Sequence, residues 1–452
     1  MLSFLPDFGN ALYTVAAFVV ALSIIVTVHE YGHYVIGRLS GIKAEVFSIG
    51  FGPRLFSRVD RHGTRWQVSL LPMGGYVKFL GDANAASAGV DPAKISGLSP
   101  EERRHTMLGA PLWARAATVA AGPIFNFILS IAIFAAIMMW SGRATEEPVI
   151  GSLYALPEVA GELRPGDRVL AIGGVATPDY PTLYKAASDG LPDTPVLTWQ
   201  VSRDGVVANV EGPQPMPARL SAVMPTSAAY AAGLQKGDVI TEINGVPVAR
   251  FADLRKATAE GQGKALTLTV WRSIEGSDAG GEIKTVTLTP KTTDVPTADG
   301  GFETRYMIGA TGDLVFAPET RRTGLIEGII GGAQQTWMVV NSSVSGLKHM
   351  ILGQISSCNL RGAIGIAEGS AAAAKSGPAD FIWFIAVLST AVGFLNLFPI
   401  PVLDGGHLVF HLYEAITGKP PSDGVMNGLM AVGMALVLAL MVFGLWNDVT
   451  CP

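Results

Sequence analysis

The chain has 452 residues, of which 49% are hydrophobic and 15% are charged, and its net charge at pH 7 is −5. So few charges over this length are unusual for a soluble enzyme. Residues 146–319 contain 22 acidic and 14 basic residues, a negative balance that argues against nucleic acid as a partner. The apolar residues are concentrated in four stretches, and a long polar segment separates the second stretch from the third. We therefore expect a polytopic α-helical protein of the lipid bilayer with a water-soluble insert.

Each of the four apolar stretches is long enough to cross a bilayer as a helix. The first has no Lys or Arg before Arg38, so it lacks the basic start of a secretory signal peptide, and we expect it to be retained. The predicted transmembrane helices lie within residues 1–37, 112–140, 380–404 and 425–446.

The first predicted span ends in the sequence His29-Glu30-Tyr31-Gly32-His33. Residues four apart share one face of a helix, so His29 and His33 can bind one metal ion while Glu30 reaches a water on it. Zinc with three protein ligands keeps a position for water, whose pKa falls to about 7. Ionisable groups buried at the end of a span are costly unless they are paired or bind metal. The motif therefore predicts a zinc hydrolase in which Glu30 is the general base and acid.

The third predicted span ends in Asn396-Leu-Phe-Pro-Ile-Pro-Val-Leu-Asp404-Gly-Gly-His407. Asp404 is the leading candidate for the third metal ligand, because the first and third spans run in the same direction and bring His33 and Asp404 to one depth. The two prolines should end the helix before Asp404, which a membrane tolerates only where the backbone is buried in protein or lines a cavity. His407 is a rival ligand, although the Gly-Gly turn favours a structural role for it.

Basic residues predict the orientation of the spans. The segment between the first two spans, residues 38–111, is rich in Lys and Arg, whereas none precedes the first span, so this segment should be cytoplasmic. The insert and both termini then lie outside, and the zinc motif lies toward the cytoplasm. The cysteines Cys358 and Cys451 are too few for a disulfide framework; they leave open a single bridge outside the cytoplasm, and we assign them no function.

The polar insert contains an internal repeat. Leu163-Arg-Pro-Gly166-Asp167 recurs as Leu234-Gln-Lys-Gly237-Asp238, a spacing of 71 residues, and each copy is followed by Ile-x-Gly-Val. This spacing is too long for a solenoid and predicts two copies of one small domain, residues 146–218 and 219–292. Both segments resemble PDZ domains, the second more closely. Residues 293–379 should form a linker and amphipathic helices, which either lie on the membrane surface or pack against the insert as a plain connector.

Two alternating segments, residues 47–53 and 66–79, follow the zinc motif and are typical of strands. By themselves they indicate a plain cytoplasmic hairpin.

Three motifs together carry a family resemblance: His-Glu-x-x-His in the first span, Gly122-Pro-Ile-Phe-Asn126 in the second, and Asn-x-x-Pro-x-Pro-x-Leu-Asp-Gly in the third. They resemble the site-2 proteases, which are intramembrane zinc metalloproteases. The order of two spans, tandem PDZ domains and two further spans resembles their bacterial branch over nearly the whole chain. The resemblance leaves the role of Asn126 open.

Several site assignments follow from this resemblance. It implies that His29, His33 and Asp404 ligate Zn²⁺, and that Asn396 contacts the substrate or supports the site. It also implies that residues 38–111 contain a membrane-dipping β-loop whose edge, with Gly74 and Gly75, pairs with the substrate. A transmembrane helix hides its amides from a protease, so strand addition to an unwound substrate meets a physical requirement of the reaction.

We therefore predict a protease of the bacterial inner membrane that cuts the transmembrane segment of single-span proteins, with periplasmic PDZ domains. The resemblance implies anti-sigma factors already shortened on the outer side, and remnant signal peptides, as substrates. The PDZ pair would exclude bulky outer domains. One alternative is a non-catalytic PDZ scaffold with a structural metal, which would need a closed four-ligand site. A metal transporter would need ionisable groups along a path across the membrane, whereas here they lie at one depth.

Overall fold

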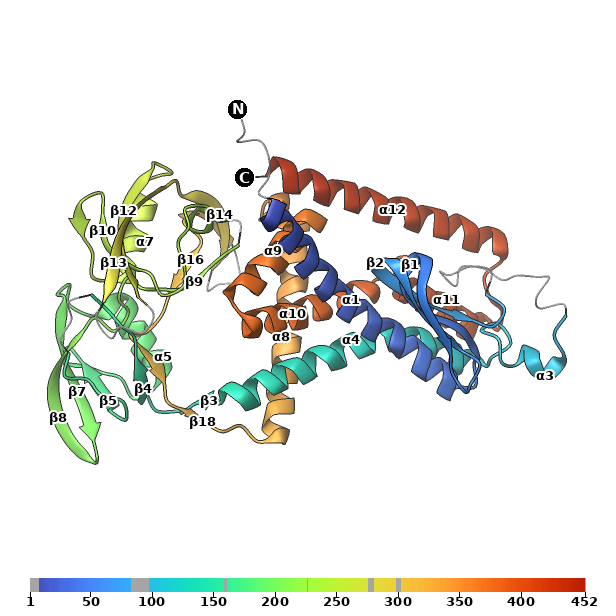
Figure 1. Cartoon of the computed structure of the whole chain (residues 1–452), viewed down its shortest axis with the longest axis horizontal. Coiled ribbons are helices and arrows are strands. Elements are labelled where there is room, and N and C mark those ends of the chain that lie inside the picture. Colours follow the sequence, from blue (N-terminus) through green and yellow to red (C-terminus); the bar gives the residue numbers. More distant parts are fainter. Residues whose placement is uncertain are drawn as a thin grey trace. The chain divides into compact units, whose positions relative to one another are not determined.

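Figure 1 shows a computed structural model of the chain, which describes residues 8–82, 97–157, 161–225, 227–274, 280–297 and 302–451. Residues 83–96 of the predicted β-loop region therefore lie outside the described residues. The chain folds as two compact units. The first contains residues up to 138 together with 325–351 and 357–451, and the second contains mainly 139–324.

The first unit is built from helices that carry the apolar stretches. Four of its described helices are long and apolar enough to cross a membrane, as the sequence predicts. They are α1 (Phe8–Leu39), α4 (Leu112–Ser141), α10 (Pro378–Asn396) and α12 (Asp423–Thr450). The shorter or less apolar helices of this unit are α3 (Pro100–Arg103), α8 (Leu325–Ile351), α9 (Ala363–Ser376) and α11 (Asp404–Thr417).

The third predicted span is interrupted before Asp404, as its prolines predict. Helix α10 ends at Asn396 and α11 begins at Asp404, with Pro399 and Pro401 in the turn between them. Gly406 closes this turn: a Cβ atom there would lie 2.5 Å from the Cα of Pro401, so a side chain would prevent the chain from folding back. The turn brings Asp404, the first residue of α11, close to the zinc motif.

A small antiparallel sheet follows α1. Strands β1 (Ala44–Val59) and β2 (Arg65–Phe79) both bend, so residues 46–49 pair with 65–68 on one side, and residues 44–49 pair with 75–79 on the other. Residues 54–59 pair with 65–69, so among the described strands 75–79 forms one edge of the sheet. The hydroxyl of Ser23 donates to the carbonyl of Pro72 at 3.4 Å, which brings the turn within β2 beside the apolar part of α1.

The second unit contains two four-stranded sheets with the same strand order, β6-β5-β7-β8 and β11-β10-β12-β13. In each, a buried aspartate of the repeated Gly-Asp turn pairs with an arginine, Asp167 with Arg203 and Asp238 with Arg272, both at 2.7 Å. The sequence repeat therefore corresponds to two copies of the same strand arrangement. The strands are β5 (Arg168–Ile172), β6 (Val175–Ala176), β7 (Val196–Arg203), β8 (Val206–Pro213), β10 (Val239–Ile243), β11 (Val246–Pro247), β12 (Leu266–Ser273) and β13 (Gly281–Leu288).

The segment expected to be a linker contributes one strand to each repeat. Strand β17 (Phe316–Pro318) pairs with β4 (Ile150–Leu153) of the first repeat, and β16 (Ala310–Gly312) pairs with β9 (Leu220–Val223) of the second. Phe316 is buried in the first core and Ala310 in the second. The remaining elements of this unit are β3 (Arg143–Ala144), α5 (Tyr180–Lys185), α6 (Ala228–Ala231), α7 (Phe251–Glu260), β14 (Lys291–Pro296), β15 (Phe302–Met307) and β18 (Thr320–Arg321).

A disulfide between Cys358 and Cys451 joins the segment before α9 to the end of α12. The side chain of Asn447 donates to the carbonyl of Ser357 at 2.8 Å. The carboxylate of Asp448 accepts from the amide of Gly362 at 2.9 Å, at the start of α9. The cysteines therefore lie within a set of contacts that fastens α12 to α9.

Candidate active site

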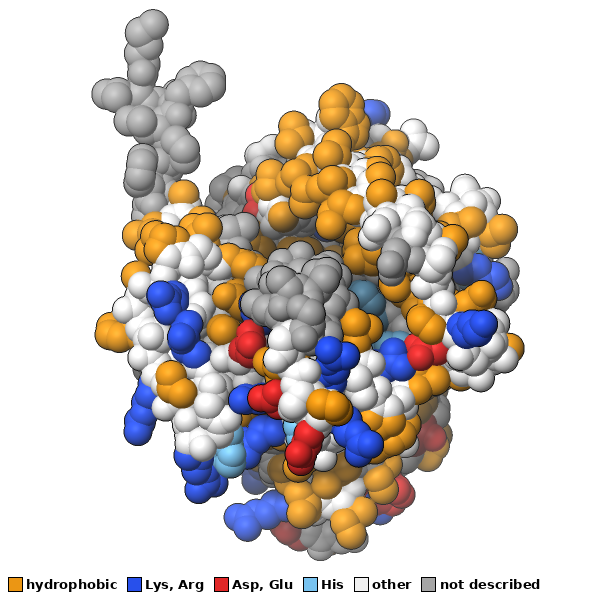
Figure 2. Space-filling model, turned by 90° about the vertical axis from the view of Figure 1, so that its right-hand side faces the viewer, with side chains coloured by type: hydrophobic (Ala, Val, Ile, Leu, Met, Phe, Trp, Pro, Cys, Tyr) orange, Lys and Arg blue, Asp and Glu red, His pale blue; other side chains and the backbone are white. Residues whose placement is uncertain are grey.

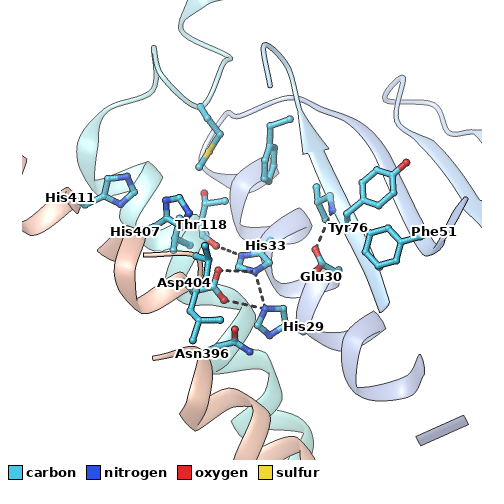
Figure 3. A pocket seen from close by; sticks show the side chains of 17 residues that line it. His29, Glu30, His33, Phe51, Tyr76, Thr118, Asn396, Asp404, His407 and His411 are labelled. Carbon is cyan, nitrogen blue, oxygen red and sulfur yellow. Dashed lines mark hydrogen bonds and ion pairs between the residues drawn. The ribbon is translucent and has the colours of Figure 1, made fainter. Parts of the chain in front are cut away.

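Three side chains from α1 and α11 converge on one point (Figure 3). The Nε2 atoms of His29 and His33 lie 3.2 Å apart, and Asp404 places its carboxylate oxygens 3.1 Å from the first and 3.6 Å from the second. A tetrahedral zinc ion with bonds of about 2.0–2.2 Å spaces its ligand atoms about 3.3–3.6 Å apart. The donor types fit zinc, and their separations of 3.1–3.6 Å are close to this spacing.

The position of Asp404 at the start of α11 suits a negatively charged metal ligand. It is the first residue of that helix, where the free backbone amides and the helix dipole favour a negative charge. A Cβ at Gly405 would overlap the carbonyls of Leu397 and Phe398, so only glycine lets the turn pack this closely. The Gly-Gly sequence therefore shapes the turn that presents the carboxylate.

Helix α4 supports the two histidines from behind. The Nδ1 atom of His33 lies 2.8 Å from the carbonyl oxygen of Thr118, and the Nδ1 atom of His29 lies 3.1 Å from the side-chain amide of Asn126. Ligating histidines usually make such a second contact, which fixes the ring orientation and the tautomer. Pro123 cannot donate to the carbonyl four residues earlier, which loosens α4 in the turn after Thr118.

Gly122 makes room for both imidazoles. A Cβ atom at this position would overlap the ring of His33 and lie 2.8 Å from Cε1 of His29. The Gly-Pro-x-x-Asn motif of the second span therefore lies at the site.

Glu30 lies on the other side of His33 and points to the sheet (Figure 3). Its Oε2 atom accepts a hydrogen bond from the amide of Val77, on the 75–79 edge, at 3.1 Å. Glu30, the three converging residues and this edge line one cavity of about 310 Å³. Its lining residues are His29, Glu30, His33, Phe51, Gly75, Tyr76, Val77, Phe79, Met107, Thr118, Val119, Asn396, Val402, Leu403, Asp404, His407 and His411.

Of the three residues predicted to contact the substrate, two line the cavity and one does not. Asn396 lines the cavity, although its amide donates to the carbonyl of Val392 in its own helix at 2.9 Å. Gly75 also lines the cavity, and a Cβ there would lie 3.4 Å from Cγ of Glu30. Gly74 is not among the lining residues; it lies against Phe51 with φ at +131°, a value that favours glycine. His407 lines the cavity outside the group of three.

Some residues near the site were not singled out from the sequence. Arg115 of α4 forms a two-armed ion pair with Glu414 of α11, at 3.0 and 2.6 Å, and so ties together the helices that carry Asn126 and Asp404. His411 lines the cavity next to this pair; burial and the charge of Arg115 lower its pKa to about 4, so it is neutral at physiological pH. Its spacing from Asp404 and His407, seven and four residues, was a signal that all three share a helix face.

A zinc-protease motif within a membrane-spanning helix, completed by an aspartate from a second membrane segment, defines the class of intramembrane metalloproteases. Comparison with known proteins agrees with this class: the model of Peptidase family M50 matches residues 17–440. The chain belongs to this family and is a zinc metalloendopeptidase of the site-2 type.

Relatives match over nearly their whole length. A protein of Rhizobium meliloti (strain 1021) whose name describes a zinc metalloprotease is 36% identical over 443 residues, which cover 97% of each chain. The regulator of sigma-E protease RseP of Salmonella typhimurium (strain 14028s) is 33% identical, covering 97% of this chain and 99% of its own. RseP of Escherichia coli (strain K12) is 32% identical, covering 99% of each. These relatives support an inner-membrane protease of regulated intramembrane proteolysis.

Proposed function

We propose that this protease cuts within the transmembrane segment of single-span proteins, with His29, His33 and Asp404 holding the zinc and Glu30 moving the proton. The observation that carries this proposal is the convergence of the three ligand atoms beside a cavity that also contains Glu30. Three protein ligands leave one zinc position open, as catalytic sites require.

The zinc ion, Glu30 and Asn396 have different roles in the proposed reaction. When bound, zinc polarises the scissile carbonyl and makes a water molecule acidic enough to be deprotonated near neutral pH. Glu30 accepts the proton of the attacking water and passes it to the leaving amine, so the acid and base steps balance. Asn396 borders the cavity on the side of α10 and contacts the bound segment.

The 75–79 edge of the sheet binds the substrate by strand addition, with Gly74 and Gly75 at its start. A transmembrane helix uses its amides internally, so it must unwind before a protease can reach them, and a strand edge supplies replacement hydrogen bonds. The location of Val77 and Gly75 on the cavity wall supports this role.

The orientation places the site toward the cytoplasm and the second unit in the periplasm. Figure 2 shows many Lys and Arg side chains on one face of the molecule. In the β1–β2 region, the exposed basic residues include Arg54, Arg58, Arg61 and Arg65. Positive charge on this scale is typical of a cytoplasmic face. The disulfide supports the same orientation, because such bonds persist outside the cytoplasm.

The physiological substrates are anti-sigma factors already shortened on their outer side, and remnant signal peptides. The two repeats of the second unit act as PDZ domains that exclude substrates with bulky outer domains. Deleting the second unit should then allow untrimmed substrate to be cut; unchanged rejection of untrimmed substrate would contradict the filter.

The main test compares the wild-type chain with Glu30→Gln on a tagged single-span substrate with a short outer tail, in membranes, with zinc content measured on both. We expect Glu30→Gln to keep zinc and to lower cleavage by about 10²–10⁴-fold. Equal cleavage by both would contradict the catalytic role and favour the scaffold. Asp404→Asn should lose both zinc and cleavage.

A further inference from the structure

Asn126 is a fully buried polar side chain whose hydrogen-bonding capacity is only half used. Its amide nitrogen lies 3.1 Å from Nδ1 of His29, and it is 0% exposed. Its Oδ1 atom is buried without a hydrogen-bond partner among the described residues. A buried carbonyl oxygen without a partner is destabilising, so this orientation of the amide needs a physical explanation.

The position of the hydrogen on the His29 ring provides this explanation. Its Nε2 atom faces His33 and Asp404, at 3.2 and 3.1 Å, so this nitrogen must be free of hydrogen to bind a metal ion. A neutral imidazole then carries its hydrogen on Nδ1 and requires an acceptor there. An amide nitrogen at that position instead requires a bare Nδ1, which sends the hydrogen to Nε2 and blocks the metal. A half-turn of the Asn126 amide exchanges nitrogen for oxygen and meets the requirement.

The surroundings of Asn126 restrict it to this kind of motion. Its backbone carbonyl accepts hydrogen bonds from the hydroxyl of Ser130 on its own helix and from that of Ser389 on α10, both at 2.9 Å, and the second bond pins α4 to α10 at this turn. A Cβ at Gly393 would lie 3.1 Å from its Cβ, so there is little room beside it. The terminal amide can rotate while the rest of the residue stays in place.

We propose that Asn126 is a positioning residue for His29: in the metal-loaded protein its carboxamide oxygen accepts the Nδ1 hydrogen of His29 and holds the ring with Nε2 toward the metal. The inference rests on the proposed metal role of His29. The two histidines are then supported differently, His33 by the backbone carbonyl of Thr118 and His29 by a side chain. Only the second support can be removed by substitution.

The test measures zinc affinity by competition with a chelator, on the purified full-length chain in detergent. All variants carry Glu30→Gln, so that neither turnover nor self-cleavage affects the reading. Asn126→Leu, which has a similar volume and no acceptor, should weaken zinc binding by about 10–100-fold. Asn126→Asp, which accepts but cannot donate, should bind zinc at least as tightly as the parent, because a charged acceptor makes the stronger hydrogen bond.

Ser130→Ala is the matched control. Ser130 lies one turn away on α4, is equally buried and contacts the carbonyls of Asn126 and Ala386 but neither histidine, so its loss should leave zinc affinity unchanged. If Asn126→Leu does not yield folded protein, Asn126→Ala replaces it.

Two results would overturn the inference: parental affinity in Asn126→Leu, or an Asn126→Asp variant as weak as Asn126→Leu, since the latter would mean that donation is what His29 needs. A parent that binds no zinc would overturn the proposed metal site itself, and so the two failures are distinguishable.

Discussion

The carboxylate of Glu30 accepts a hydrogen bond from the backbone amide of Val77, with 3.1 Å between Oε2 and N. Glu30, the proposed general base, is therefore hydrogen-bonded to the strand edge that we propose to bind the substrate. A substrate strand on this edge would compete for the same amide, and its arrival would release the carboxylate toward the water and the scissile bond. Substrate pairing and proton transfer would then be linked through one amide group.

Substituting Val77 by proline removes this amide. Proline is tolerated on strand edges that do not use the N–H in the ladder, so we expect zinc content to be unchanged. Each backbone hydrogen bond contributes about 0.5–1.5 kcal/mol, so cleavage should fall by about two- to tenfold. Cleavage of a single-span substrate in membranes measures this. Val77→Ala keeps the amide and should cleave like wild type; equal rates for the two variants would show that the amide is not used.

The disulfide should stabilise the ends of α9 and α12 that it joins. Cys358 and Cys451 are 93 residues apart in sequence, and loss of a native disulfide typically costs about 2–5 kcal/mol. Thermal unfolding of purified protein should therefore shift to lower temperature on adding reductant, whereas Cys358→Ser/Cys451→Ser should already be shifted and no longer respond. Maleimide labelling of the wild-type thiols without reductant would contradict the bond.

The ion pair between Asp167 and Arg203 should be important for the first repeat. The carboxylate of Asp167 is fully buried, so removing its partner leaves an uncompensated charge, which costs on the order of 3 kcal/mol. Hydrogen exchange of the β5 and β7 amides in Arg203→Ala should accelerate accordingly. Arg168→Ala removes an exposed pair with Glu147 and should cost at most about 1 kcal/mol. Equal effects of the two substitutions would contradict the prediction.

The same pair predicts a pH dependence. Burial alone raises the pKa of Asp167, but hydrogen bonds from Arg203 and from the amide of Arg164 outweigh it, so the pKa lies below its ordinary value. A lowered folded pKa stabilises the fold above the unfolded pKa of about 3.9, and this contribution disappears as the pH falls through the folded value. The difference between wild type and Arg203→Ala should therefore shrink below about pH 4. A constant difference from pH 7 to pH 3 would exclude this origin.

The two repeats should not fold as separate pieces. Strand β17 pairs with β4 of the first repeat, and Leu314, Val315 and Phe316 belong to the core of that repeat. A fragment of residues 146–218 lacks all three, whereas residues 143–321 contain the strands of both repeats. We expect cooperative thermal unfolding, followed by circular dichroism, for the longer fragment only. Cooperative unfolding of 146–218 alone would contradict this assignment of the core.

Local pattern was enough to predict much of this protein. Continuous apolar runs predict the four membrane helices, since a span must satisfy its backbone internally whatever surrounds it. The four-residue spacing of His29 and His33 puts them on one helix face. A shared depth predicts Asp404 as their companion, and the spacing of the Gly-Asp turns predicts the repeat.

Only the tertiary structure decided the contacts between distant segments. These include the return of β16 and β17 to both repeats, the joining of Cys358 to Cys451, the attachment of Glu30 to Val77 and the place of Asn126 behind His29. Periodicity reports which face of an element is apolar, but not which distant element covers it. A hydrogen bond between residues far apart in sequence depends on the packing of whole helices and strands, which no local spacing encodes.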